Sequence, residues 1–159
     1  MKKAAVFNFS YRESYYSKDR ITTKSFDMEG NKEAIEITNN SRLIDIQEGF
    51  SLVFPYLMIE FFYLKKDGRT YNNRIDKHTL VQKIIPVNTI HKVDIRGTTT
   101  VWELVNELHG ILKVGVDICR KSGSVWNRIS VTVGWTLEEQ NSAGAFICSE
   151  MLKNGSNSI

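Results

Sequence analysis

Hydrophobic positions along the chain follow two periods in turn, and the change of period predicts alternating strands and helices. Ile35 and Ile37 alternate with polar residues, as in a strand with one buried face. Apolar residues then recur at spacings of three and four, which predicts a helix over residues 42–54 that stops before Pro55. Leu57–Leu64 is almost wholly apolar and predicts a central strand.

The same order of elements appears a second time. Val93 and Ile95 alternate with polar residues, and apolar spacing predicts a helix over residues 100–112. This helix opens with a Thr-x-x-Glu capping box, in which each side chain accepts a hydrogen bond from the other residue's backbone N–H. Residues 114–118 then alternate as a strand.

The two stretches can be laid over each other at a shift of 58 residues, which becomes 57 after the helices. Ile35 then falls on Val93, and the acidic residue Glu60 falls on Asp117. Any two amphipathic strand–helix–strand stretches resemble each other, which is the alternative explanation. The matched acids, and the basic turn that ends each stretch, favour a duplication.

Three further elements are predicted. Leu80–Val87 is expected to be a strand that joins the two units. Residues 124–133 alternate and are expected to pair with the preceding strand as a hairpin. A second capping box, at Thr136 and Glu139, opens a helix expected to run to about Leu152.

Together these elements predict an α+β fold. We expect a two-layer domain of duplicated β–α–β units, with both helices on one face of a mostly antiparallel sheet. The arrangement is ferredoxin-like, with tandem β-grasp units as the alternative. Residues 1–33 form a basic, tyrosine-rich N-terminal segment. The body is 34–135, with units at about 34–66 and 90–123 and a hairpin strand at 124–133; residues 136–159 form the C-terminal helix and tail.

Two sequence stretches resemble a known family. Arg120-Lys121-Ser122-Gly123-Ser124-Val125-Trp126, followed by Trp135-Thr136-Leu137-Glu138-Glu139-Gln140-Asn141, is similar to a signature of small uncharacterised proteins from Bacteroidetes. Phe54-Pro55-Tyr56-Leu57-Met58-Ile59-Glu60-Phe61-Phe62 resembles the first half of that family, so the likeness covers roughly residues 35–141. It implies no activity. The chain departs from the pattern at Lys113, where a glycine is expected to close the helix. The Thr100-Val101-x-Glu103-Leu104 stretch also resembles ubiquitin-like β-grasp sequences.

Charge and composition place the chain among intracellular globular proteins. Hydrophobic residues make up 42% of it, and no apolar run approaches the roughly 20 residues of a membrane helix. The two cysteines are expected to be buried thiols, which suits a cytoplasmic location. Six basic and two acidic residues give residues 1–25 a net charge of +4, whereas the remainder carries −1.

No catalytic pattern is found, so the protein is not expected to be an enzyme. The sequence has no glycine-rich phosphate loop, no Gly-x-Ser-x-Gly elbow and no pair of histidines at metal-binding spacing. His78, His91 and His109 fall in different predicted elements. Cys119 adjoins two basic residues, but its position at the end of a strand favours packing. No cofactor and no metal are predicted.

Three features are candidates for binding. The first is the N-terminal segment, where aromatic rings alternate with cations, a composition suited to single-stranded nucleic acid or to a solvated tail: Tyr11, Arg12, Tyr15, Tyr16, Lys18 and Arg20. The second is the pair of basic turns, Lys65-Lys66 and Arg120-Lys121. The third is the set of three tryptophans, expected mainly in the core, of which Trp126 is the candidate for an exposed contact.

Two functions follow from these features. The first is a non-enzymatic binding or assembly module that contacts another protein, or a second copy of itself, through a sheet edge. The alternative is a nucleic-acid-binding protein that uses the basic N-terminal segment. No membrane contact is predicted.

Overall fold

The computed structural model of the protein describes residues 34–66, 71–85 and 90–155. In chain order the strands and helices are β1 Ala34–Ile37, α1 Leu43–Val53, β2 Leu57–Leu64, β3 Tyr71–Arg74, α2 Val81–Ile84, β4 His91–Asp94, α3 Val101–Leu112, β5 Gly115–Ser122, β6 Val125–Arg128 and α4 Leu137–Gly155. The predicted N-terminal segment, residues 1–33, lies outside the described residues.

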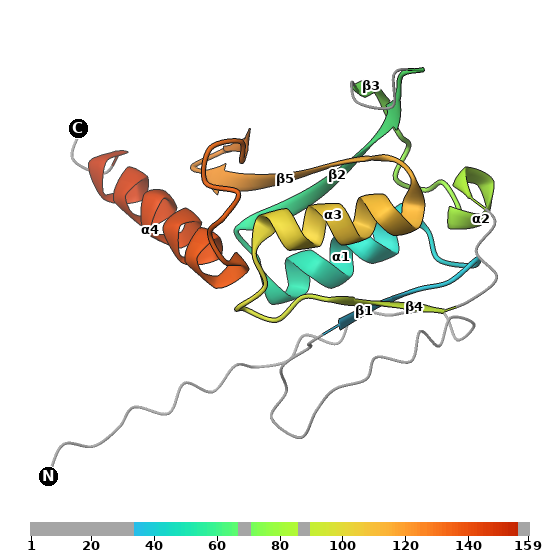
Figure 1. Ribbon diagram of the computed structural model, residues 1–159. Coiled ribbons are helices and arrows are strands. Elements are labelled where there is room, and N and C mark those ends of the chain that lie inside the picture. Colours follow the sequence, from blue (N-terminus) through green and yellow to red (C-terminus); the bar gives the residue numbers. More distant parts are fainter. Residues whose placement is uncertain (1–33, 67–70, 86–89, 156–159) are drawn as a thin grey trace, which may run out of the picture.

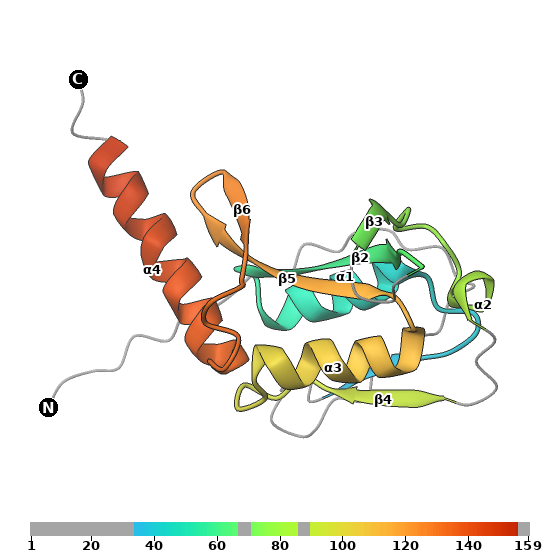
Figure 2. The ribbon, with the colours of Figure 1, turned by 45° about the horizontal axis from the view of Figure 1, so that its top comes forward.

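The protein has an α+β fold in which four helices pack on a mostly antiparallel sheet, curled into a half-barrel (Figure 1). Its strands form two hydrogen-bonded groups, β1-β4 and β3-β2-β5-β6, and each pairing is antiparallel. Helices α1 and α3 lie between these two groups (Figure 2). Because β1 and β2 belong to different groups, the single sheet of the predicted ferredoxin-like arrangement is not shown.

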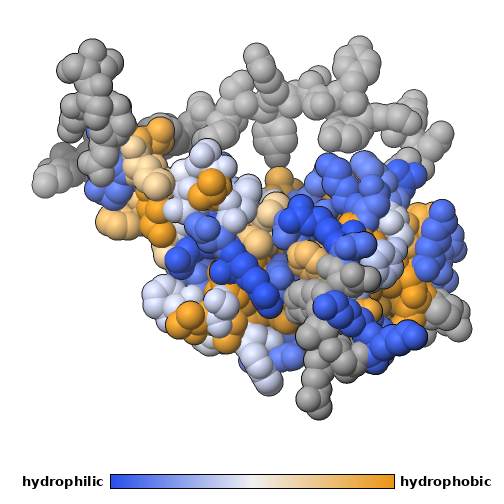
Figure 3. Space-filling view, turned by 90° about the horizontal axis from the view of Figure 1, so that it is seen from above, coloured by the Kyte–Doolittle hydropathy of each residue, from blue (hydrophilic) through white to orange (hydrophobic). Residues whose placement is uncertain are grey.

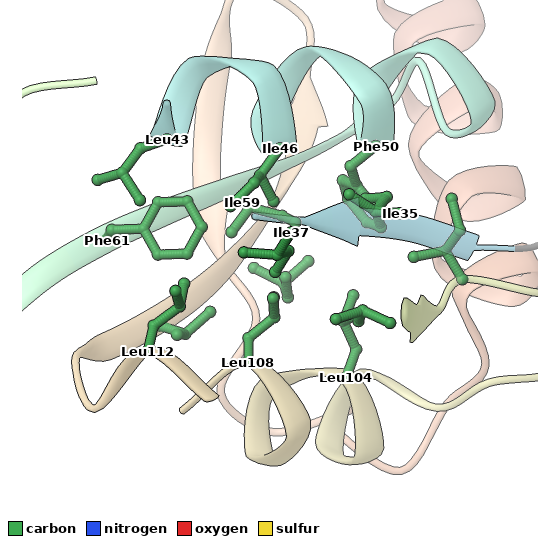
Figure 4. Close-up of a cluster of buried hydrophobic side chains, with 14 of the residues drawn as sticks. Ile35, Ile37, Leu43, Ile46, Phe50, Ile59, Phe61, Leu104, Leu108 and Leu112 are labelled. Carbon is green, nitrogen blue, oxygen red and sulfur yellow. The ribbon is translucent and has the colours of Figure 1, made fainter. Parts of the chain in front are cut away.

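The core lies between α1 and α3, which present their apolar faces to each other (Figure 4). Leu43, Ile46 and Phe50 of α1 face Leu104, Leu108 and Leu112 of α3, with side chains from β1 and β2 between them. These are the helical positions at spacings of three and four, so the periodicity of the sequence determines which face of each helix is buried.

The helix ends confirm some predictions and correct others. Thr100 and Glu103 form the predicted capping box, with the Thr100 N–H donating to Glu103 Oε2 at 2.8 Å. At α1 the cap is Arg42, and its N–H donates to Asp45 Oδ2 at 2.7 Å. Lys113 closes α3 in a left-handed conformation, with φ of 55°, at the position where a glycine was expected.

Two predicted strands are wrong in whole or in part. Val81–Ile84 is a short helix, α2, where a strand over 80–87 was predicted. The hairpin strand predicted over 124–133 ends at Arg128. Beyond it the chain turns toward α3, where Val133 O accepts a hydrogen bond from the N–H of Trp102 at 2.9 Å. Strand β3, which pairs with β2 on the side opposite β5, was not predicted from the sequence pattern.

Helix α4 closes one end of the core and projects beyond it (Figures 1 and 2). Gln140 is fully buried in α4 and accepts a hydrogen bond from Arg120 Nη1 at 2.8 Å. Asn141 Oδ1 accepts the backbone N–H of Tyr56 at 2.9 Å. A Cβ atom at Gly144 would come within 2.7 Å of Tyr56 Cβ, so only glycine permits this close approach.

Candidate functional site

The predicted basic turns lie at opposite ends of the central strand pair. In the β2–β5 register, Arg120 pairs with Leu57 at the start of β2, whereas Lys65 and Lys66 follow its last residue. At about 3.3 Å per residue, eight strand residues separate the two turns by roughly 26 Å. Arg120 is also engaged by Gln140. The four cations therefore do not form one surface, and their role in binding stays a prediction.

Strand β6, with Trp126, stands at one edge of the four-stranded sheet. All four of its residues are exposed, and Trp126 is 38% exposed. The Lys121 ammonium lies 5.8 Å from the centre of the Trp126 ring, a distance that suits a cation–π contact. The expectation that Trp126 is exposed is confirmed, and its role as a contact residue stays a prediction.

The hydrogen-bond pattern sets the direction of the Trp126 backbone. Lys121 N–H donates to Tyr56 O across the β2–β5 pair, so the odd-numbered residues of β5 bond to β2 and the even-numbered residues bond to β6. The bonded pairs with β6 are consequently Arg120–Asn127 and Ser122–Val125. The N–H and C=O of Trp126, which alternates with these residues, point away from β5 toward the sheet edge.

The other two tryptophans are not in the core, contrary to expectation. Trp102 is 61% exposed at the start of α3, and Trp135 is 45% exposed before α4. The 133–135 segment lies against the α3 N-terminus, because Val101 N–H donates to Trp135 O at 3.1 Å. Val131, in the same loop, is 91% exposed. This loop and the start of α3 therefore carry three exposed apolar side chains, those of Trp102, Val131 and Trp135.

Two clefts flank the sheet, one in each half of the described chain. The first cleft has a volume of about 630 Å³ and lies between α1, β2 and residues 74–77. The second has about 180 Å³ and lies between α3, β5 and residues 128–133. Figure 3 looks from above Figure 1 onto the outer face of the sheet, where hydrophilic and hydrophobic residues are interspersed.

Each cleft contains an arginine–carboxylate ion pair at the same place. Arg74 Nη2 lies 2.7 Å from Glu60 Oε1 in the first cleft, and Arg128 Nε lies 2.9 Å from Asp117 Oδ1 in the second. The carboxylates are nearly buried, with side chains 12% and 9% exposed, and the arginines are open to solvent. Glu60 and Asp117 are direct cross-strand partners. Because like charges placed opposite each other repel, each needs its own arginine.

The backbone around the clefts is also held by matching bonds. The N–H of Leu43 donates to Thr79 O, and that of Val101 donates to Trp135 O, both at 3.1 Å. The isolated bridges Arg42–Leu80 and Thr100–Thr136 correspond in the same way. A side chain of each helix is hydrogen-bonded to a carbonyl at or just before the start of the next strand: Ser51 Oγ to Leu57 O, and His109 Nδ1 to Val114 O.

The residues that line the two clefts, in contrast, differ in polarity. Ile44 in the first cleft corresponds to Trp102 in the second at the shift of 58, and Gln47 corresponds to Val105. Gln47 Nε2 donates to Ile59 O at 2.7 Å, a bond that valine cannot make. The lining of the first cleft also includes the charged residues Glu48, Asp76 and Lys77, whereas the last residue that lines the second cleft is the apolar Val133.

Groups that could carry reaction chemistry are few among the described residues. No three His, Cys, Asp or Glu side chains in residues 34–66, 71–85 and 90–155 are placed to hold a metal ion. Both cysteines are free; Cys119 is buried and Cys148 half-buried. Burial, with the nearby Glu60 and Asp117 carboxylates, raises the pKa of Cys119 to about 11, so its thiol is neutral near pH 7.

The predicted nucleic-acid residues between Tyr11 and Arg20 lie outside the described part of the chain, so this alternative stays a prediction. Within the described part, no helix is both long enough and apolar enough to span a bilayer. No family model, curated protein or solved structure matches the sequence or the fold. The resemblance to the Bacteroidetes family therefore also stays a prediction.

Proposed function

We propose that this protein is an assembly module that pairs with a second copy of itself through strand β6. The observation that supports this proposal is the edge position of Trp126, with its backbone N–H and C=O directed away from the sheet. An edge of this kind accepts another strand, and β6 contains no proline to prevent it.

A second copy suits this edge because the pairing is self-complementary. In an antiparallel pair with its two-fold axis at Trp126, each Trp126 N–H donates to the C=O of the other Trp126. The two indoles then lie side by side on the outer face, where aromatic cross-strand pairs contribute up to about 1 kcal/mol. With only four residues in β6, the interface is small and the dimer is expected to be weak.

Sedimentation equilibrium over a range of protein concentrations tests this proposal. The wild-type protein should show a concentration-dependent dimer. Trp126→Pro removes the outward N–H without removing a β5–β6 bond, and it should leave a monomer with a native circular dichroism spectrum. Trp135→Ala, a change of another exposed tryptophan outside the strand, should dimerise like the wild type. A wild-type monomer at every concentration, or a dimer unaffected by Trp126→Pro, would refute the proposal.

We also infer that the chain contains two copies of a β-α-β-β-α unit, related by a pseudo-two-fold axis. Under the sequence shifts, Ile35 corresponds to Val93 and Glu60 to Asp117, and each of these residues is paired in the sheet with its own counterpart. A two-fold axis through both pairs would produce this register. An experimental structure in which the halves superpose by a rotation far from 180° would contradict the duplication.

A further inference from the structure

The two clefts provide a comparison within one molecule. Because both contain the arginine–carboxylate pair, that pair belongs to the shared frame and does not by itself indicate a ligand. A charged group that is present only in the larger cleft, and that has no partner within the protein, is a better indication of a ligand than this shared pair. The first cleft contains such groups of both charges.

The unpaired groups are a carboxylate and an ammonium. Among the described residues, the Glu48 carboxylate and the Lys77 ammonium are exposed to solvent and make no hydrogen bond or ion pair within the protein, and both residues are part of the cleft lining. Asp76 uses Oδ1 to accept the N–H of His78 at 2.8 Å. Arg74 contacts Glu60 through Nη2. That contact orients the Arg74 guanidinium, whose other N–H groups can donate to a ligand.

We propose that the first cleft binds a small zwitterion, namely a free amino acid with an apolar side chain. The cleft is open to solvent, and its volume of about 630 Å³ is within the usual range for ligand sites. The carboxylate of the ligand meets Arg74 and Lys77, and its ammonium meets Glu48 and Asp76. Ile44, Met58 and Ile75 provide an apolar wall for the side chain. This proposal does not depend on dimer formation through β6.

The second cleft cannot bind the same ligand. Its volume of about 180 Å³ is too small for an amino acid with its contacts, and Trp102 stands where the first cleft has Ile44. Its lining has no counterpart of the free Lys77 ammonium, because Val133 occupies that part of the loop. The second cleft is therefore a built-in negative control.

The test is a nuclear magnetic resonance titration of the full chain with three related probes. L-Leucine is the zwitterion, 4-methylpentanoate lacks its amino group, and 3-methylbutylamine lacks its carboxylate. L-Leucine should shift the amide signals of Ser51, Glu60 and Ile75 to saturation. Each incomplete probe should bind at least about tenfold more weakly, because a hydrogen bond to a charged group is lost.

Two pairs of variants locate the binding. Ile44→Trp introduces into the first cleft the tryptophan found at the corresponding position of the second, and it should abolish the shifts caused by leucine. Trp102→Ile, the reverse change in the second cleft, should leave those shifts unchanged. Arg74→Gln should weaken binding at least about tenfold, and Arg128→Gln should not. Amide signal dispersion reports whether each variant is folded. The proposal is wrong if leucine produces no saturable shift, if 4-methylpentanoate binds equally well, or if folded Ile44→Trp binds as the wild type does.

Discussion

The first half of the described chain, residues 34–85, and the second half, residues 90–155, share a frame but differ in the surface they build on it. Helix α1 of the first half and helix α3 of the second are each capped with the help of a carboxylate, of Asp45 and of Glu103, and each half pairs one arginine with a nearly buried acid. The first half has a cleft of about 630 Å³, whereas the corresponding cleft of the second half has only about 180 Å³. The helix caps and the arginine–carboxylate pairs are thus the same in both halves, although the residues around the clefts differ.

The largest expected effect tests whether the halves contribute equally to the core. Phe50 and Leu108 occupy corresponding positions and are fully buried. Phe50→Ala should lower the free energy of unfolding by about 3–5 kcal/mol and Leu108→Ala by about 2–5 kcal/mol, from lost burial and the cavity left behind. Urea denaturation followed by circular dichroism measures both. If one variant costs less than 1 kcal/mol, the halves do not share the core equally.

A smaller effect is expected from the two arginines. Arg128→Met leaves the Asp117 carboxylate nearly buried without its arginine, and Arg74→Met does the same to Glu60. Each change should cost about 1–3 kcal/mol, because a desolvated charge is left without that partner. The same urea titration applies, with Lys92→Met as the control at a pair whose acid is less buried. Equal stability of Arg128→Met and Lys92→Met would show that the pairing of Arg128 with Asp117 has no structural role.

Helices α1 and α3 end differently, and this predicts a gain in stability. Helix α1 stops at Phe54 before a proline, whereas α3 ends in a left-handed Lys113. A side chain in this conformation costs about 1 kcal/mol that glycine does not pay. Lys113→Gly should therefore raise the free energy of unfolding by about that amount. Lys113→Ala, which keeps the Cβ atom, should show no comparable gain, and a gain of equal size would contradict this explanation.

The smallest effect is expected at the surface of the second half. Trp102→Ile and Trp135→Thr introduce the residues found at corresponding places in the first half, Ile44 and Thr79. Because both tryptophans are largely exposed, each change should alter the free energy of unfolding by no more than about 0.5 kcal/mol. A loss above about 2 kcal/mol in thermal or urea unfolding would mean that these side chains stabilise the fold rather than serve as a contact surface.

Much of the fold could be predicted because apolar periodicity determines which face of an element is buried. The strand that contains Ile35 and Ile37, the helices α1 and α3, and strand β2 follow from that pattern alone. Strand β3 could not be found in this way, since Asn73 and Arg74 are exposed and leave no alternation to detect. The apolar run after Leu80 is too short for its period to distinguish the helix α2 from a strand.

The candidate sites were less predictable because they depend on contacts between distant residues. The match of Glu60 with Asp117 was visible in the sequence, but the arginines that neutralise them were not, since each comes from the next strand of a hairpin. The exposure of Trp102 could not be predicted either, because its helix has an apolar face nearby. Only Trp126, placed after a tight turn, carried a local signal of exposure.

The strand pairings have a consequence for how the protein folds. β1 of the first half pairs with β4 of the second, and β2 pairs with β5, so neither half can complete its hydrogen bonds alone. Folding should therefore be cooperative, with a single transition and no stable half-folded intermediate. The paired residues are 58 positions apart at Ile35 and Val93, so closing such long loops should limit the folding rate.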